Sequence, residues 1–312
     1  MNQAVSPPAS IVIASRESAL AMWQAQFISR QLSLLYPQTR ISIMGMTTRG
    51  DQILDRPLAK IGGKGLFIKE LEQALEDGKA DIAVHSMKDV PMMLPEGFML
   101  ASITEREDPR DAFVSNRYKG LSALPEGAVV GTSSLRRESQ LRNSFPHLKV
   151  EALRGNVQTR LRKLDEGQFD AIILAAAGLK RLELSDRIAA LIAPEESLPA
   201  VGQGALGIEC RAGREDILQW LKPLYHDETA KCVLAERVVS SILGGSCQVP
   251  LGAYAEIANG RMRLRAFVAS PDGTDMIRAE QEGEPDAYAE TGRLVAERLL
   301  ECGAGEILAR LG

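Results

Sequence analysis

The sequence predicts two α/β units followed by a small antiparallel α+β unit. Short apolar runs alternate with helical patterns through the first two thirds of the chain, which is typical of a mainly parallel sheet covered by helices. The last third instead has an Asn259-Gly260 hairpin signal and an alternating strand from Met262 to Val268. With 312 residues, the chain is long enough for two or three domains.

The first unit is built from short apolar strands, each followed by a helical pattern or a polar loop. The predicted elements are strands over 11–14, 41–46 and 81–85, a helix over 18–35, and a helix that follows Gly62-Gly63-Lys64-Gly65. In sheets of this kind, ligands bind beside the loops that leave the carboxyl ends of strands. The loop Ser86-Met87-Lys88-Asp89 occupies such a place after the third strand.

The second unit repeats the alternation of strand and helix, and the last third departs from it. The second unit has predicted strands over 128–130, 149–153 and 169–175, with helices that end near 141 and 164. A connector rich in Pro and Gly covers 197–204. The last third has a helix to 242, strands over 254–257, 262–268 and 274–281, and a closing helix over 286–301.

Composition and charge exclude several classes of protein. Thirty-seven Lys and Arg against 41 Asp and Glu give a net charge of -4, which argues against a general nucleic-acid binder. No apolar run approaches the roughly 20 residues of a membrane span, and the first residues lack a secretory signal pattern. Three widely separated histidines give no support for a metal site. Four cysteines without a CxxC pair favour a reducing, cytoplasmic compartment.

Cys247 lies on a glycine-rich turn, Gly244-Gly245-Ser246-Cys247, between a helix and a strand. A thiol on such a turn is accessible and suits covalent attachment of a ligand. The alternative is an unreactive free cysteine, because unpaired cysteines are most often small buried hydrophobes. Spacing alone leaves both interpretations open.

Three basic turns follow predicted strand ends. Arg136 and Arg137 lie in the first turn of a helix that Thr132-Ser133-Ser134 opens, where cations oppose the helix dipole. An acidic ligand would resolve that conflict, because helix N-termini bind anions and arginine binds carboxylates in a fork. The other two turns contain Arg154-Gly155-Asn156 with Arg160, and Arg16 with Ser18. Together they predict a multiply charged anion as ligand, although each arginine alone could be a solvated surface residue.

Asp89 follows the third strand beside Lys88 and could stabilise a developing cation or move protons. A cap or a surface ion pair is the alternative. Lys64 resembles the lysine of a phosphate loop, but Gly65 follows it where that loop needs Ser or Thr, so this nucleotide-binding motif is rejected. His85 has no visible partner and is interpreted as a strand residue.

These segments together resemble the porphobilinogen deaminase (hydroxymethylbilane synthase) family, over nearly the whole chain from about residue 11 to the last helix. The long motifs that carry the resemblance are Arg16-Glu17-Ser18, Trp23-Gln24-Ala25, Thr48-Arg49-Gly50-Asp51, Gly62–Phe67, Ala83–Pro91, Gly131–Arg137, Leu153–Asn156, Leu198–Gly204 and Gly245–Pro250. No functional position departs from the family's pattern, and Ser246 is a harmless variation.

The resemblance implies a transferase of porphyrin and heme biosynthesis. Such an enzyme condenses four porphobilinogen molecules head to tail with loss of ammonia, and water then releases linear hydroxymethylbilane. The chain grows on a dipyrromethane cofactor, which a thioether would join to Cys247. Asp89 would be the catalytic group that stabilises the cation formed as ammonia leaves. The expected enzyme is a cytoplasmic monomer that needs no metal, nucleic acid or membrane.

The remaining site residues are also carried over by resemblance. Those expected to hold the cofactor are Ser86, Lys88, Thr132, Ser133, Ser134, Arg136, Arg137, Arg154, Gly155 and Arg160. Those expected to bind substrate are Arg16, Ser18, Arg154, Arg160, Arg181 and Gln203. Lys64 and Phe67 would lie in a flexible loop over the cleft.

The implied fold has two domains like those of periplasmic binding proteins, with the site between them, and a third domain that carries the cysteine. The expected boundaries are 1–104 with 205–222, then 105–204, then 223–312. A non-catalytic two-domain module that binds small carboxylates would explain the arginines, but it leaves Cys247 and Asp89 without a role. RNA binding through the arginines is opposed by the acidic balance and by an aromatic content of only 4%.

Overall fold

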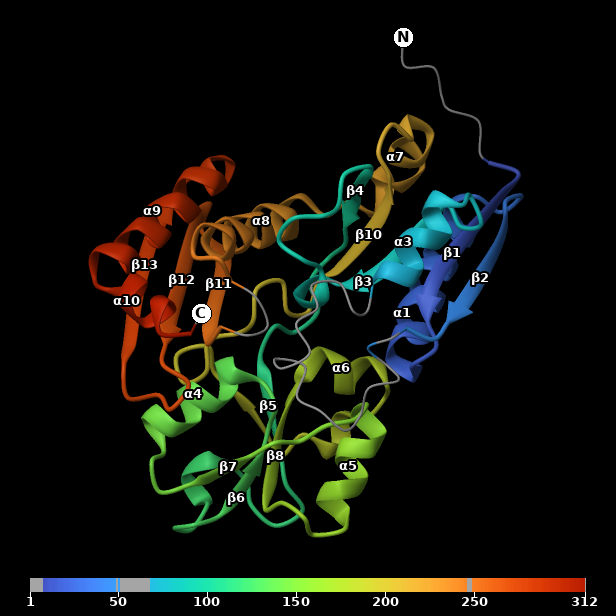
Figure 1. The fold of residues 1–312 in the computed structure, drawn as a ribbon. Coiled ribbons are helices and arrows are strands. Elements are labelled where there is room, and N and C mark those ends of the chain that lie inside the picture. The colour runs from blue at the N-terminus through green and yellow to red at the C-terminus, as the bar shows by residue number, and fades with distance from the viewer. Residues whose placement is uncertain (1–7, 49, 51–67, 246–248, 312) are drawn as a thin grey trace. The chain divides into compact units, whose positions relative to one another are not determined.

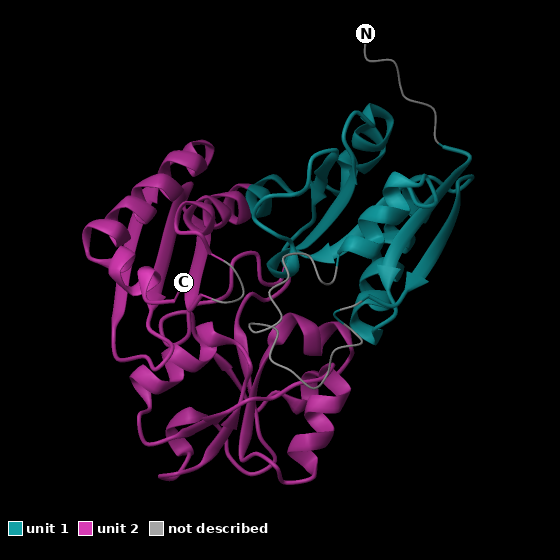
Figure 2. Cartoon of the chain, in the orientation of Figure 1, with its two compact units in different colours: residues 1–106, 205–230 teal, residues 107–204, 231–312 magenta. Residues whose placement is uncertain are grey.

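The structure is a computed structural model that describes residues 8–48, 50, 68–245 and 249–311. The chain forms two compact units, which Figure 2 distinguishes by colour. Unit 1 comprises residues 1–106 and 205–230, and unit 2 comprises 107–204 and 231–312. Three sheets are present in the described residues, one in unit 1 and two in unit 2 (Figure 1). The sequence-based boundaries of three domains stay a prediction.

The sheet of unit 1 has the strand order β2-β1-β3-β10-β4. Its strands are β1 (Ser10–Arg16), β2 (Arg40–Met46), β3 (Ile82–Ser86), β4 (Phe98–Ile103) and β10 (Leu206–Arg211). The helices of this unit are α1 (Ala19–Leu35), α3 (Lys69–Glu76) and α7 (Glu215–Leu221). Strand β1 pairs in parallel with β2 and β3, whereas β10 pairs antiparallel with β3 and β4. Strands β1, β2, β3 and β4 therefore run in one direction, as expected of a mainly parallel sheet, and β10 runs against them.

Alternation along β3 determines which side chains reach each layer of unit 1. Ile82 and Val84 join the cluster that α1 and α7 cover, while Ala83 packs with Leu71 and Leu75 of α3. Successive side chains of a strand point to opposite faces, so His85 lies on the α3 face with Ala83. On β10, Glu209 is paired with Ala83 and therefore lies on this face too.

The first sheet of unit 2 has the order β7-β6-β8-β5-β9. Its strands are β5 (Asp111–Val114), β6 (Val129–Gly131), β7 (Lys149–Glu151), β8 (Ala171–Ala175) and β9 (Ala190–Ile192), and its helices are α4 (Leu135–Ser144), α5 (Val157–Asp165) and α6 (Ala176–Arg181). This sheet is mixed in the same way, because β6 pairs in parallel with β7 and β8 while β5 pairs antiparallel with β8 and β9.

The second sheet of unit 2 is a three-stranded antiparallel sheet, as the sequence predicts. It comprises β11 (Leu251–Ala258), β12 (Arg261–Ala269) and β13 (Met276–Gly283), with α9 (Tyr288–Glu301) and α10 (Ala304–Ala309) packed against it. Asn259 and Gly260 have φ of 52° and 75°, the left-handed pair that a tight two-residue hairpin requires. The long helix α8 (Asp227–Ile242) precedes this sheet.

Short 3-10 turns complete the described elements: η2 (Met87–Asp89), η3 (Leu121–Ala123), η4 (Ser185–Arg187), η5 (Lys222–Leu224) and η6 (Pro285–Ala287). The fold class is confirmed as two α/β sheets with a C-terminal antiparallel α+β part. Sequence patterns missed β4, β5, β9 and β10.

Candidate active site

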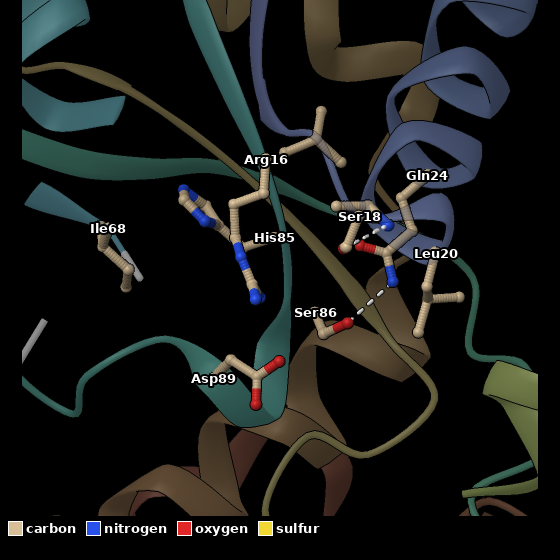
Figure 3. A pocket seen from close by; sticks show the side chains of 10 residues that line it. Arg16, Ser18, Leu20, Gln24, Ile68, His85, Ser86 and Asp89 are labelled. Carbon is tan, nitrogen blue, oxygen red and sulfur yellow. Dashed lines mark hydrogen bonds between the residues drawn. The ribbon is translucent and has the colours of Figure 1, made fainter. Parts of the chain in front are cut away.

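A pocket in unit 1 contains the predicted catalytic carboxylate (Figure 3). Its polar lining consists of Arg16, Ser18, Gln24, His85, Ser86 and Asp89, and Leu20, Ala21, Ile68 and Val84 form the remainder. Figure 3 shows Arg16 and Asp89 extending into the same space from different elements. The pocket therefore combines an exposed carboxylate with a guanidinium and hydroxyl donors.

Parallel strands β1 and β3 bring these side chains together. Arg16 is the last residue of β1, and Ser86 is the last residue of β3. Carboxyl ends of neighbouring parallel strands meet at one edge of a sheet, where ligands bind in α/β folds. Ser18 follows β1 as the N-cap of α1, and its hydroxyl accepts a hydrogen bond from the amide of Ala21. Asp89 ends η2, the turn that leaves β3.

Two residues of this pocket were not identified as site residues from the sequence. Gln24 of α1 is 3% exposed, and its amide nitrogen donates to the Ser86 hydroxyl at 2.8 Å. His85 is buried, and its Nε2 lies 2.7 Å from the carboxylate of Glu209. The Trp23-Gln24-Ala25 motif was a signal for Gln24. No local signal could identify His85 as a site residue, because its partner Glu209 belongs to β10, which lies far away in the sequence.

The start of α4 holds the predicted hydroxyl cluster in unit 2. Thr132 is buried, Ser134 is half-buried and Ser133 is exposed. The Ser133 hydroxyl donates to the carbonyl of Leu153 at 2.8 Å, and the Thr132 hydroxyl accepts from the amide of Ser134 at 3.2 Å. The cluster is thus fixed between β6 and the segment after β7.

Arg136 and Arg137 have an internal partner that the sequence did not reveal. Both guanidiniums bind the fully buried carboxylate of Asp111, at 2.8 Å in each ion pair. Burial alone would raise the pKa of Asp111, but the two arginines hold it well below its usual range. The Nε of Arg136 is buried without a hydrogen-bond partner in the structure. Cofactor binding by these arginines stays a prediction.

The Arg154-Gly155-Asn156 turn precedes α5 and has a conformation that glycine permits. Gly155 has φ of 115°, and a Cβ there would come within 2.6 Å of the Thr159 side chain. The carbonyl of Gly155 accepts a hydrogen bond from Nε of Arg160 at 2.8 Å, and Asn156 caps the helix through the amide of Thr159. Arg154 and Arg160 are both half-buried beside this turn.

Arg181 and Gln203 are held within unit 2. Nη2 of Arg181 donates to the carbonyl of Gly204 at 2.6 Å, and burial lowers the pKa of Arg181 to about 10. The Gln203 amide donates to the carbonyl of Pro109 and to Asp111. Both side chains are more than nine-tenths buried. Their predicted contacts with substrate are not tested by this geometry.

The predicted attachment residue Cys247, together with Lys64 and Phe67, lies outside the described residues. The elements that flank Cys247 in sequence are described, and one carboxylate links them. Glu236 of α8 is fully buried and accepts hydrogen bonds from the amides of Gly202 at 2.7 Å and Ala255 of β11 at 2.9 Å. Of the other cysteines, Cys210 and Cys232 are buried, which argues against attachment there, and Cys302 is exposed.

The described donor sets fit a dipyrromethane with acidic side chains. Such a group presents pyrrole N–H donors and several carboxylates. The N–H donors need a hydrogen-bond acceptor on the protein, and the carboxylates need cationic and hydroxyl side chains. Unit 1 provides the Asp89 carboxylate with Arg16, Ser18 and Lys88. Unit 2 provides the hydroxyls before α4 and the arginines around Gly155. The buried, unpartnered Nε of Arg136 is one donor without an internal acceptor.

Comparisons with known proteins agree over almost the whole chain. The family described as "Porphobilinogen deaminase, dipyromethane cofactor binding domain" matches residues 11–219, and "Porphobilinogen deaminase, C-terminal domain" matches 230–301. A porphobilinogen deaminase of Nitrosomonas europaea is 67% identical over 307 residues, which are 98% of this chain and all of that protein. One from Ralstonia nicotianae is 64% identical over 313 residues, covering 99% of this chain and 94% of that protein.

A solved structure of the aliphatic sulphonate binding protein SsuA from Escherichia coli aligns with 77% of this chain and 76% of its own, at 13% identity and a TM-score of 0.40. Within the described ranges, the chain contains no helix that is long and apolar enough to cross a membrane.

Proposed function

The chain belongs to the porphobilinogen deaminase family, and on this premise we propose that it condenses four porphobilinogen molecules head to tail. Ammonia leaves at each condensation, and hydrolysis then frees the linear tetrapyrrole hydroxymethylbilane. Two family matches that together span residues 11–219 and 230–301 support this proposal. A dipyrromethane cofactor, when bound, supplies the covalent anchor on which the pyrrole chain grows.

We propose Asp89 as the catalytic group. The observation that carries this assignment is the pocket of unit 1, where the exposed Asp89 carboxylate shares a wall with Arg16 and Ser18. Departure of ammonia leaves positive charge on the substrate, and a carboxylate at that place stabilises this charge. The pyrrole N–H groups are donors, so the same carboxylate also orients the ring.

The cationic side chains hold the acetate and propionate groups in this proposal. Arg16 and Ser18 bind substrate in unit 1, and Lys88 and Ser86 bind the cofactor there. Arg154 and Arg160 serve both ligands in unit 2, and the backbone at Gly155 allows a close approach. The hydroxyls before α4, Arg136 and Arg137 add contacts to the cofactor, and Arg181 and Gln203 add contacts to the substrate.

The covalent link is proposed at Cys247, with Lys64 and Phe67 contributing from the segment before α3. We also propose the division into domains 1–104 with 205–222, 105–204 and 223–312, a monomeric state, and a cytoplasmic location. Support for Cys247 comes from the family matches, and Glu236 of α8 holds β11 through the amide of Ala255, which connects the two elements that flank Cys247 in sequence.

The catalytic assignment is tested with Asp89→Asn. The variant keeps the shape of the carboxylate and removes its charge, so the folded protein and its bound adduct should persist while turnover falls at least about 10²-fold. Steady-state turnover of porphobilinogen measures the loss, and intact mass under denaturing conditions measures the adduct.

Asp77→Asn is the matched control, because Asp77 lies at the end of α3 and is not part of the pocket lining. Its turnover should equal that of the unaltered protein. Near-normal turnover of the Asp89 variant would contradict the assigned role.

The attachment site is tested with Cys247→Ala. Peptide mapping of the unaltered protein should find a mass excess of two pyrrole units on the peptide that contains Cys247. The variant should lack this adduct even after incubation with porphobilinogen. A covalent adduct on the variant would refute the site, and a protein that never acquires an adduct would favour a non-catalytic binding module.

A further inference from the structure

His85 occupies a place that the proposed mechanism does not use. It is the residue before Ser86 at the end of β3, and it lines the same pocket as Asp89 and Arg16 (Figure 3). His85 is 7% exposed and belongs to the lining of that pocket. An imidazole is the one side chain whose ordinary pKa lies near neutral pH, so a histidine in the pocket wall could take up and release protons during the reaction.

Glu209 fixes the orientation of this ring. The antiparallel register pairs Gly207 with His85 and Glu209 with Ala83, so Glu209 lies diagonally across from His85 on the same face. One carboxylate oxygen, Oε2, lies 2.7 Å from Nε2 of His85. The other, Oε1, is buried without any hydrogen-bond partner in the structure. Nε2 can donate its hydrogen to Oε2, since an ionised carboxylate only accepts.

Glu72 of α3 completes the buried cluster. It is 8% exposed, and burial and then the charge of Glu209 raise its pKa, while His85 opposes the rise. The charges of Glu72 and Glu209 therefore disfavour each other inside this cluster. The other charged groups near this cluster are Lys69 of α3 and, on the pocket side, Arg16 and Asp89.

We propose that His85 is a proton carrier in the wall of the Asp89 pocket and that Glu209 is the positioning residue that fixes its Nε2–H tautomer. The proposal rests on the proposed function. With Nε2 bound to Glu209, the lone pair of Nδ1 is the basic site of the ring, and Glu209 stabilises the imidazolium that forms when Nδ1 takes a proton.

The condensation releases a proton that a base near the substrate must accept. A C–N bond breaks and ammonia leaves with the electron pair; a pyrrole carbon then forms the new C–C bond and loses its hydrogen as a proton. In this proposal the lone pair of Nδ1 takes that proton and later returns it to ammonia, which departs as ammonium. Asp89 then stays ionised as the counter-charge, a role that it would lose on accepting the proton itself.

Nuclear magnetic resonance of the imidazole nitrogens tests the tautomer directly. The chain has only three histidines, so His147→Gln and His226→Gln assign the spectrum by elimination. In the protein as purified, with its adduct verified by intact mass, neutral His85 should be the Nε2–H tautomer. Glu209→Gln should alter that signature. An Nδ1–H tautomer for His85 in the unaltered protein would overturn the proposal.

Kinetics of His85→Gln test the proton transfer. The Gln amide can still donate to Glu209 but cannot take up a proton, so kcat should fall by about 10²-fold. In the unaltered protein kcat should fall towards acid pH, because a protonated Nδ1 cannot take up the proton, and the variant should lack this limb of the profile. His226→Gln, whose ring bonds to Thr229 away from the pocket lining, is the matched control and should be unchanged.

The outcomes separate this inference from the proposed function. Full kcat and an unchanged pH profile in the His85 variant, with Asp89→Asn inactive, would reject the proton carrier alone and leave the catalytic carboxylate standing. Activity in Asp89→Asn would instead reject the proposed function. If His85→Gln does not fold, an Nδ1–H tautomer in the unaltered protein would still overturn the proposal, and an acid limb of kcat in the unaltered protein would support it.

Discussion

At the scale of single residues, substitution of the buried Asp111 tests how much its ion pairs contribute to the stability of unit 2. Asp111→Asn removes the anion between Arg136 and Arg137 and leaves two guanidiniums buried without a counter-charge. Breaking a buried pair on one side costs about 3–5 kcal/mol. Urea unfolding should show this loss for unit 2.

Asp165→Asn is the control for this prediction. Asp165 is 48% exposed in its pair with Arg187, and exposed pairs contribute less than about 1 kcal/mol. Equal losses for the two variants would contradict the structural role of Asp111.

Site residues whose position follows from a predicted strand end were found from the sequence, and contacts with residues far away in the sequence were not. Sequence reasoning placed Arg16, Ser18 and Asp89 at strand ends, and the structure brings them to one pocket because β1 and β3 are parallel neighbours. It could not foresee that Asp111 binds Arg136, since this pairing joins side chains 25 residues apart through β5, a strand that no pattern identified. For the same reason it interpreted His85 as a plain strand residue.

At the scale of elements, the conformation of the turn before α5 predicts how much stability unit 2 loses when a single methyl group is added at Gly155. Gly155→Ala should destabilise unit 2 by about 1–2 kcal/mol through its positive φ, and the contact with Thr159 should add about 1–3 kcal/mol. Thermal unfolding with a matched variant measures the difference.

Gly167→Ala is the matched variant, because Gly167 has φ of 75° just after α5 but open space around a Cβ. It should show only the conformational cost. A loss for Gly155→Ala no greater than for Gly167→Ala would mean that the neighbouring side chain moves aside freely.

Elements that neighbouring residues determine were predicted from the sequence, and elements that depend on distant parts of the chain were missed. Helix α1 was predicted almost to its ends, because Ser18 caps it and its apolar stripe repeats at helical spacing. The β11–β12 hairpin was predicted because Asn259-Gly260 encodes its own turn. Strand β10 was missed, since it is stabilised by antiparallel pairing with β3 and β4, which lie far earlier in the chain.

At the scale of the whole molecule, neither unit is a continuous piece of chain. Unit 1 needs residues 205–230 to place β10 between β3 and β4, and unit 2 resumes at residue 231. The periodicity of the sequence shows alternating strands and helices but not these returns, and only the family resemblance implied that residues 205–222 belong with the first domain. Each five-stranded sheet therefore contains one strand antiparallel to the other four, β10 in unit 1 and β5 in unit 2.

The two units should differ in how much stability they lose in acid, because their buried carboxyl groups have pKa shifts of opposite sign. In unit 2, burial alone would raise the pKa values of Asp108 and Asp111, but Arg110 with Lys180, and Arg136 with Arg137, hold them well below the usual range. Depressed pKa values contribute stability that is present above the unfolded pKa and is lost as pH falls. In unit 1, the raised pKa of Glu72 has the reverse sign, so its contribution is present at low pH and is lost as pH rises through the folded pKa.

Unit 2 should therefore open before unit 1 as the pH falls below about 5. Hydrogen exchange read by mass spectrometry, corrected for the intrinsic pH dependence of exchange, follows peptides of both units in one sample. Fluorescence reports unit 1 independently, because both tryptophans, Trp23 and Trp220, belong to it. Asp111→Asn should flatten the acid response of unit 2 without altering that of unit 1. Loss of protection in unit 1 first would show that the Asp111 and Asp108 clusters do not govern acid stability.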